Sequence, residues 1–255
     1  MNQPKSISKI ILLCALMHIV SKTTGQDASE VTKETIVTKA WEAMFGELKS
    51  EEIKSIYLES YFHGRKVPGR ITFKRPNLYR NETENNVIVF DGKRAALIDK
   101  SPEKSGDPNY LEIVDSSYWC HFEVDIALIF PAFFEYPSEY KGIYRKGENE
   151  SYELYVELPL GGNVSYFIDT KSFLITRRLV SWEGDPDQDL WENLITGYID
   201  YEGILFEKGF SFIGNDGREE GYFRNVKFDA KTEDSKFQIP SDSLLYMKPE
   251  KGGES

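Results

Sequence analysis

Apolar residues recur at helical spacing near the start of the chain, between Ser29 and Leu48. Residues three and four apart share one face of an α-helix, and the stripe consists of Val37, Ala40, Trp41, Met44, Phe45 and Leu48. Asp27 followed by Glu30 resembles an N-terminal capping arrangement. The spacing predicts an amphipathic helix over 29–48 that packs on a sheet, with a membrane or partner surface as the alternative.

From Ser55 onward the period of the apolar positions changes to two, which is typical of half-buried strands. Asp91-Gly92, between two apolar runs, is a strong hairpin signal. The pattern predicts a mainly β (α+β) fold with a meandering antiparallel sheet, open or nearly closed. The expected strands are 55–63, 69–75, 87–90, 94–98, 152–158, 164–169, 173–182, 194–201, 203–213 and 222–228, with a last strand at Phe237 to Pro240.

The interval from Ser101 to Tyr140 interrupts the strand pattern. After a loop-like beginning, residues 119–136 are apolar on nearly all sides and include Pro131, which ends or kinks a helix. We expect a short, broken helical segment lying over the sheet. It is either ordinary core or a movable cover above an apolar cavity, and the pattern leaves both readings open.

The segment Gly69–Arg80 (GRITFKRPNLYR) contains an unusual charge placement. Ile71 and Phe73 share one face of the expected strand, and Arg75 falls in phase with them. Pro76 has no N–H for a sheet ladder, so the strand ends or becomes an edge there. Because an unpaired buried charge is costly, Arg75 needs acceptors within reach, which makes it the leading candidate functional residue.

The first 25 residues have the features of an export signal. Lys5 and Lys9 form a positive n-region, and residues 10–20 are an apolar run too short to span a bilayer. Cleavage after Gly25 would leave Gln26 as the first mature residue, and a short uncleaved anchor is the alternative. Nothing after that marks a linker, so we expect one domain over 26–255 with a frayed tail after about residue 246.

Charge and cysteine content narrow the function classes. Loss of the signal would remove three lysines and no acidic residue, which takes the formal charge from −11 to −14. Such a chain repels phosphate backbones, so no nucleic-acid partner is expected. Cys120 would be the only cysteine left and could form no internal disulfide. Beside Trp119 it is expected to be a small buried apolar residue.

Few side chains suit catalysis or metal binding. The mature chain contains only His63 and His121, and the common metal, phosphate-loop and nucleophile-elbow motifs are missing. Residues 185–189 (DPDQD) resemble the start of a calcium loop, but Leu190 and Thr196 stand where such a loop requires Gly and Glu. We therefore expect no enzyme activity, no catalytic residue, no metal and no cofactor.

Aromatic residues are abundant on the expected strands. A single curved sheet with one or two helices cannot fill its whole concave face, so part of that face becomes an apolar groove. Burial of an apolar ligand there would be favourable by about 25 cal/mol per Å². An acyl chain could therefore bind without any catalytic group.

Three segments resemble the bacterial periplasmic lipoprotein carrier family LolA. Lys74–Tyr79 (KRPNLY) resembles the family's Lys-Arg-Pro-Asn-Leu-aromatic segment, and Val87–Lys93 (VIVFDGK) resembles its next strand and Asp-Gly-Lys turn. Lys236–Pro240 (KFQIP) looks like its closing Phe-x-x-Pro strand. The order of signal peptide, helix, strands, helical interruption and strands is also similar.

The resemblance implies a half-open antiparallel barrel, LolA/LolB-like, with helices covering its concave face as a lid. The cavity beneath would take the acyl chains of lipoproteins or lipids, and Arg75 would hydrogen-bond the lid's backbone and hold the empty cavity closed. The partners implied are an inner-membrane releasing complex and an outer-membrane acceptor. The expected latch and ligand-binding residues are Arg75, Tyr79, Ile71, Phe73, Ile126, Phe130, Phe133 and Phe134.

Our leading hypothesis is a periplasmic lipid or lipoprotein carrier that serves outer-membrane lipoprotein sorting. A periplasmic sensor or protein-interaction domain is the alternative, because the same fold serves several functions. Acidic residues such as Glu153, Glu157 and Asp187 would then dock a partner. A hydrolase is a third hypothesis, and it would require His63 or His121 beside a carboxylate in a cleft.

Overall fold

The computed structural model describes residues 31–49, 52–64, 67–100, 110–182, 191–214 and 217–239. The expected signal peptide, the acidic loop at 185–189 and the tail after residue 246 lie outside these residues. The strands are β1 (Ser55–Phe62), β2 (Gly69–Lys74), β3 (Leu78–Glu82), β4 (Asn86–Phe90), β5 (Ala95–Asp99), β6 (Tyr110–Ile113), β7 (Ser138–Lys146), β8 (Asn149–Glu157), β9 (Gly162–Asp169), β10 (Ile175–Trp182), β11 (Trp191–Tyr201), β12 (Ile204–Gly214) and β13 (Gly217–Phe228). The helical elements are α2 (Lys33–Phe45), η2 (Ser116–Tyr118), α4 (Trp119–Ile129), η3 (Ala132–Phe134) and η4 (Asp234–Phe237).

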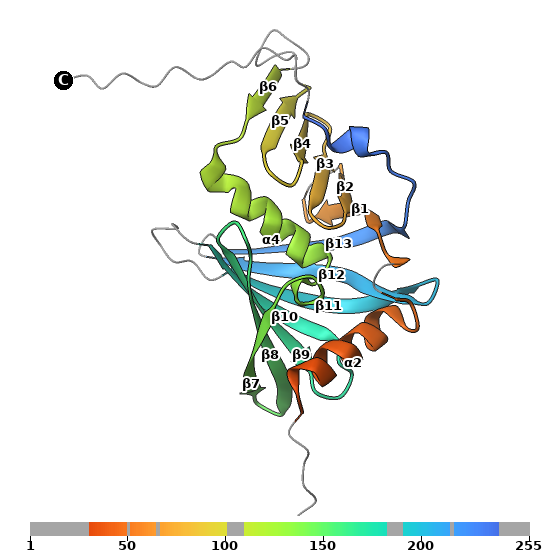
Figure 1. Ribbon diagram of the computed structural model, residues 1–255, viewed down its shortest axis with the longest axis vertical. Coiled ribbons are helices and arrows are strands. Elements are labelled where there is room, and N and C mark those ends of the chain that lie inside the picture. The colour runs from red at the N-terminus through yellow and green to blue at the C-terminus, as the bar shows by residue number, and fades with distance from the viewer. Residues whose placement is uncertain are drawn as a thin grey trace, which may run out of the picture.

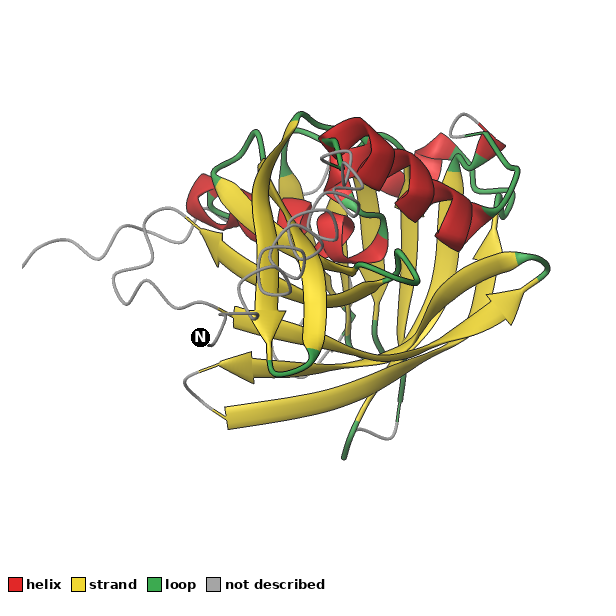
Figure 2. Ribbon diagram, turned by 90° about the horizontal axis from the view of Figure 1, so that it is seen from below, coloured by secondary structure: helices red, strands yellow, loops and turns green. Residues whose placement is uncertain are grey.

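The strands form one antiparallel sheet of 13 strands in the order β6-β5-β4-β3-β2-β1-β13-β12-β11-β10-β9-β8-β7. β6 and β7 follow each other in the chain but lie at opposite edges, and α4 connects them across the concave face (Figure 1). Figure 2 shows the helices lying in the hollow of the curved sheet. The predicted mainly β fold, a curved and unclosed sheet with helices over its concave face, is confirmed.

The strand register explains why the apolar positions of the first half meet on one face. Leu58 pairs with Ile71, and Phe73 pairs with Tyr79, which in turn pairs with Phe90. Leu58, Phe73, Tyr79 and Phe90 are all buried. Side chains alternate along each strand, so this register builds the apolar surface on which the helices lie.

Helix α2 packs on the sheet, as its apolar stripe predicts. Ile36, Ala40, Met44 and Phe45 are buried in the common core. The helix begins at Lys33, four residues later than predicted, because the Thr32 hydroxyl accepts a hydrogen bond from Thr35 N and so caps the first turn.

The expected broken helical segment is confirmed. Helix α4 ends at Ile129, and the 3₁₀ helix η3 follows Pro131. Cys120 on α4 is buried, as predicted, and burial raises the pKa of its thiol. Within the described part of the chain, no helix combines the length and apolar character needed to cross a membrane.

Some elements were missed or wrongly predicted. β3, β6 and β7 lie in segments where the period-two pattern is short or mixed with polar residues. Phe237 belongs to η4 and not to a closing strand. Its side chain is buried, and Arg80 Nη1 donates to Lys236 O at 3.0 Å, which holds this turn beside β3.

Candidate functional site

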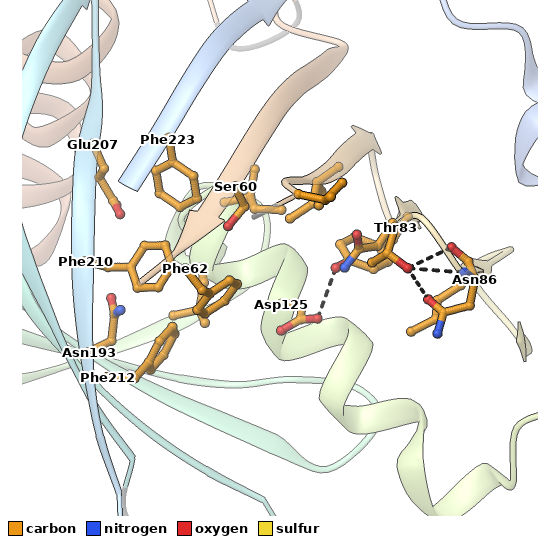
Figure 3. Close-up of a pocket in the computed structure, with 18 of the residues that line it drawn as sticks. Ser60, Phe62, Thr83, Asn86, Asp125, Asn193, Glu207, Phe210, Phe212 and Phe223 are labelled. Atoms are coloured by element: carbon orange, nitrogen blue, oxygen red, sulfur yellow. Dashed lines mark hydrogen bonds between the residues drawn. The ribbon is translucent and has the colours of Figure 1, made fainter. Parts of the chain in front are cut away.

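A cavity of about 710 Å³ lies between α4 and the concave face of the sheet. Its walls come from both halves of the sheet, which places residues far apart in the sequence around one space (Figure 3). The volume is within the range typical of small-molecule sites. The lining residues are Ser60, Phe62, Val67, Gly69, Ile71, Tyr79, Asn81, Thr83, Glu84, Asn85, Asn86, Ile88, Asp125, Leu128, Ile129, Arg178, Asn193, Glu207, Phe210, Phe212 and Phe223.

One end of the cavity is aromatic. Phe210 contacts the rings of Phe62 and Phe223, with centroid distances of 5.4 and 5.0 Å, and Phe212 extends the same wall (Figure 3). A Cβ added at Gly221 would lie 2.5 Å from Phe210 Cζ, so only glycine leaves room for this ring. The local sequence therefore creates an apolar end between β1, β12 and β13.

A buried charged group lies in the wall on the β10–β12 side. Arg178 Nη1 donates to Asn193 Oδ1 at 2.8 Å and to Glu207 Oε2 at 3.1 Å, and Nη2 pairs with Glu207 Oε1. Arg178 is 1% exposed. Burial disfavours its charge, but the Glu207 carboxylate compensates, so the pKa of the guanidinium lies above its ordinary value. The two charges neutralise each other within the wall.

Helix α4 presents Asp125, Leu128 and Ile129 to the cavity. Asp125 Oδ2 accepts a hydrogen bond from the Tyr79 hydroxyl at 3.2 Å, which connects the helix to β3. The Asp125 side chain is exposed to the cavity, whose lining comes from α4 and from both halves of the sheet. The resulting desolvation raises the pKa of Asp125 to about 6, while the Tyr79 hydroxyl opposes the increase. Burial also raises the pKa of Tyr79.

The opposite side of α4 is fixed to β9 and to the turn before it. The Tyr166 hydroxyl donates to Ala127 O at 2.9 Å and accepts from Ala132 N at 2.8 Å, so it satisfies backbone groups where α4 ends. Glu123 Oε2 accepts from Leu160 N at 2.7 Å. A Cβ at Gly162 would come within 2.8 Å of the Val124 side chain, so glycine permits this close packing.

Arg75 lies where β2 ends. Its Nη1 donates to Ile53 O at 2.9 Å, its Nη2 pairs with the Glu135 carboxylate, and its guanidinium lies 5.0 Å from the Phe130 ring centroid. Both charged side chains are 18% exposed. Arg75 therefore joins β2 to the segment after η3. The Glu135 acceptor is a side-chain carboxylate, and Ile53 O is a backbone acceptor that precedes β1. Hydrogen bonds from Arg75 to the backbone of the lid stay a prediction.

The eight residues predicted for the site fall into three places. Ile71 and Tyr79 line the cavity, and Arg75 lies at the end of the covering segment, residues 119–135. The other five belong to the common core, where Phe130 stacks on Phe73 at 6.0 Å. This packed group is Phe73, Ile126, Phe130, Phe133 and Phe134.

Sequence reasoning missed the aromatic end and Asp125. Phe210, Phe212 and Phe223 stand on strands that were predicted, but nothing in the alternation tells which face encloses a space. Asp125 is one of two acidic residues, with Glu123, in a mostly apolar helix, which is the signal that could have identified it. His63 is exposed, and the centroid of the His121 ring lies 4.6 Å from that of Trp182. The described residues contain no cluster of three or more potential metal ligands.

No protein-family model matches the chain, and no curated protein matches it. Solved structures do match. A LolA superfamily protein from Nitrosomonas europaea superposes with a TM-score of 0.54 at 12% identity, covering 82% of this chain and 98% of that protein. A chain described as an outer membrane lipoprotein-sorting protein domain, from Vibrio parahaemolyticus, gives a TM-score of 0.46 at 11% identity, covering 79% and 94%. A DUF1329 family protein from Desulfovibrio piger gives a TM-score of 0.47 at 10% identity, covering 80% of this chain and 96% of that protein.

The chain therefore has a LolA-like fold, which confirms the predicted resemblance at the level of structure. The match with the Nitrosomonas protein extends over nearly the whole of that protein and includes both halves of the curved sheet. At this identity it establishes the arrangement of the elements. Function has to be argued from the cavity itself.

Proposed function

We propose that this protein is a lipid carrier that holds an acyl chain in the cavity between α4 and the sheet. The observation that carries the proposal is the cavity of about 710 Å³ with an aromatic end built from β1, β12 and β13. Each methylene buried there would contribute about 0.8 kcal/mol. For a chain of ten or more carbons these contributions add up to enough free energy for non-covalent binding.

The proposed setting is the periplasm, after removal of residues 1–25. The signal-like sequence and the names of the structural neighbours support this setting. Sorting of outer-membrane lipoproteins, with an inner-membrane donor and an outer-membrane acceptor, is the finer form of the proposal. The role that we propose involves no catalytic step.

The proposal is tested with the chain from Gln26 onward, purified from cells and extracted with organic solvent. Mass spectrometry of the extract should find acyl lipid at a stoichiometry near one per protein. The delipidated protein should then take up an uncharged pyrene-labelled fatty alcohol with saturable fluorescence. Absence of both co-purified lipid and uptake would contradict the carrier function.

A pair of substitutions at Ile71 locates the binding. Ile71 lines the cavity from β2 and is only partly buried, so Ile71→Trp should fill space without disturbing the core. It should reduce probe affinity at least tenfold, whereas the matched control Ile71→Leu should bind as the wild type does. Equal affinity in both variants would place the probe elsewhere.

A further inference from the structure

The charged groups around the cavity are unbalanced. Among its lining residues, Glu84, Asp125 and Glu207 are acidic, and Arg178 is basic. Arg178 is already engaged by Glu207 and Asn193 through its two terminal nitrogens. Its remaining Nε is buried and has no hydrogen-bond partner, so it offers no surface to a ligand. Among the described lining residues, an anionic group entering the cavity would meet two carboxylates that no arginine or lysine of that lining pairs with, those of Glu84 and Asp125.

Asp125 is the charged group best placed to meet a ligand. It stands on α4 in the middle of the cavity, between the aromatic end and the turn that contains Thr83 and Asn86 (Figure 3). Tyr79 occupies Oδ2 only, and the side chain is exposed to the cavity. Its other oxygen can therefore accept a hydrogen bond from a ligand. A carboxylate in such a place attracts donors and repels anions.

The turn between β3 and β4 is not a competing anion site. Thr83 Oγ1 donates to Asn86 Oδ1 at 2.6 Å and accepts from Asn86 N at 3.2 Å, so the Thr83 hydroxyl and the Asn86 backbone N–H already bond within the turn. Glu84 in the same turn adds negative charge. Among the described lining residues, Glu84 at this turn and Asp125 on α4 thus both disfavour a phosphate or carboxylate.

We propose that the cavity selects amphiphiles whose polar group donates a hydrogen bond and carries no negative charge, and that Asp125 is the residue that receives this group. The hydroxyl of an uncharged lipid and the ammonium of a cationic one share this chemistry. The inference rests on the proposed carrier function and specifies its ligand class. The chain would occupy the aromatic end, and the polar group would lie at α4.

The experiment compares three ligands of equal chain length by displacement of the uncharged pyrene probe at pH 7.5. They are dodecan-1-ol, dodecylamine and dodecanoate. We expect dodecan-1-ol and dodecylamine to bind at least tenfold more tightly than dodecanoate, and their ratio tells the hydroxyl from the ammonium. Equal affinity for all three, or tightest binding of dodecanoate, would overturn the selectivity but leave the carrier function intact. Failure of every ligand and of the probe itself would reject the carrier function.

Asp125→Asn tests the assigned residue. The substitution should bring the affinity for dodecanoate to within about threefold of the affinity for dodecan-1-ol, because the amide removes the negative charge and keeps the shape of the side chain. Glu112→Gln, an exposed residue of β6 outside the cavity lining, makes the same change in net charge and should leave the tenfold preference unchanged. Retained preference in Asp125→Asn would overturn the assignment. Should that variant fail to fold, the ranking of the three ligands by the wild-type protein still decides the selectivity.

Discussion

The two sides of the covering segment 119–135 are built in opposite ways. The side toward β9 and the core is packed, since Phe130 and Phe133 are buried and Tyr166 satisfies the backbone at the end of α4. The side toward β1–β4 faces a cavity and carries Asp125 and Leu128. The difference shows that a single helix can be core on one face and the wall of a binding site on the other.

This difference also bears on how the cavity could open. Helix α4 bonds to β9 and its preceding turn through Tyr166 and Glu123, whereas a side-chain hydrogen bond between Tyr79 and Asp125 links it to β3. Buried hydrogen bonds to backbone groups are costly to break without replacement. We therefore expect α4 to stay with β9, and access to come from its separation from β3.

The largest expected effect is the loss of stability when a side chain on the packed side is truncated. Phe130→Ala should lower the free energy of unfolding by about 3–5 kcal/mol, because it leaves a cavity among Trp41, Phe45 and Phe73. Leu128→Ala on the cavity face should lower it by only about 1 kcal/mol, since that side chain already borders open space. Urea unfolding followed by tryptophan fluorescence measures both. Equal losses would remove the distinction between the two sides.

Tyr166→Phe should cause the next largest loss in the free energy of unfolding. It removes the hydroxyl that serves Ala127 O and Ala132 N, and the loss should be about 1–3 kcal/mol. Tyr79→Phe is the matched control, because its hydroxyl donates to a side-chain carboxylate that faces the cavity and not to the backbone; it should cost less than about 1 kcal/mol. The same unfolding experiment compares the two. A larger loss for Tyr79→Phe would mean that β3 and not β9 anchors α4.

Arg75 is expected to act on release more than on stability. Arg75→Leu should keep the probe bound but change its dissociation rate several-fold, with an unfolding loss of about 1 kcal/mol, since the pair with Glu135 is partly exposed. Stopped-flow dissociation of the pyrene probe measures the rate. A double-mutant cycle with Glu135→Gln should show a coupling of about 1 kcal/mol. If Arg75→Leu simply unfolds, the residue is structural and the latch is rejected.

A further expected effect is a pH dependence of stability. The pKa of Asp125 is about 6 in the folded protein against an ordinary 3.8, so between these values the folded state holds a proton that the unfolded state has lost. Stability therefore falls as pH rises from about 4 to above 6. Subtracting the urea midpoints of Asp125→Asn from those of the wild type isolates this contribution. A difference that does not change with pH would show that Asp125 has an ordinary pKa.

Much of the fold is predictable from local pattern. Alternation placed most strands, and Pro131 correctly marked the break between α4 and η3. Phe237 was misassigned because a short apolar segment has the same pattern in a strand and in a 3₁₀ turn. The start of α2 was misplaced because Thr32, and not an earlier polar residue, supplies the cap.

The site was less predictable. Ile71 and Arg75 are in phase along the predicted strand. In the structure, Ile71 lies in the cavity wall and Arg75 lies beside the covering segment. Phe130 and Phe133 were predicted for the site but belong to the core. The sequence could not show this, because hydrophobicity alone does not distinguish a packed face from an empty one. Glu135 and Glu207 became partners of arginines through contacts across 60 and 29 positions respectively, and single-sequence periodicity carries no information at such separations.

The most direct test of the account is the site of ligand contact. An uncharged fatty alcohol with a photoactivatable diazirine at the end of its chain should be bound, irradiated, and its adducts mapped by mass spectrometry. We predict adducts on the aromatic end, at Phe62, Phe210 or Phe212, that disappear in Ile71→Trp. Adducts confined to the outer surface, or unchanged in that variant, would contradict the claim that the cavity under α4 holds the chain.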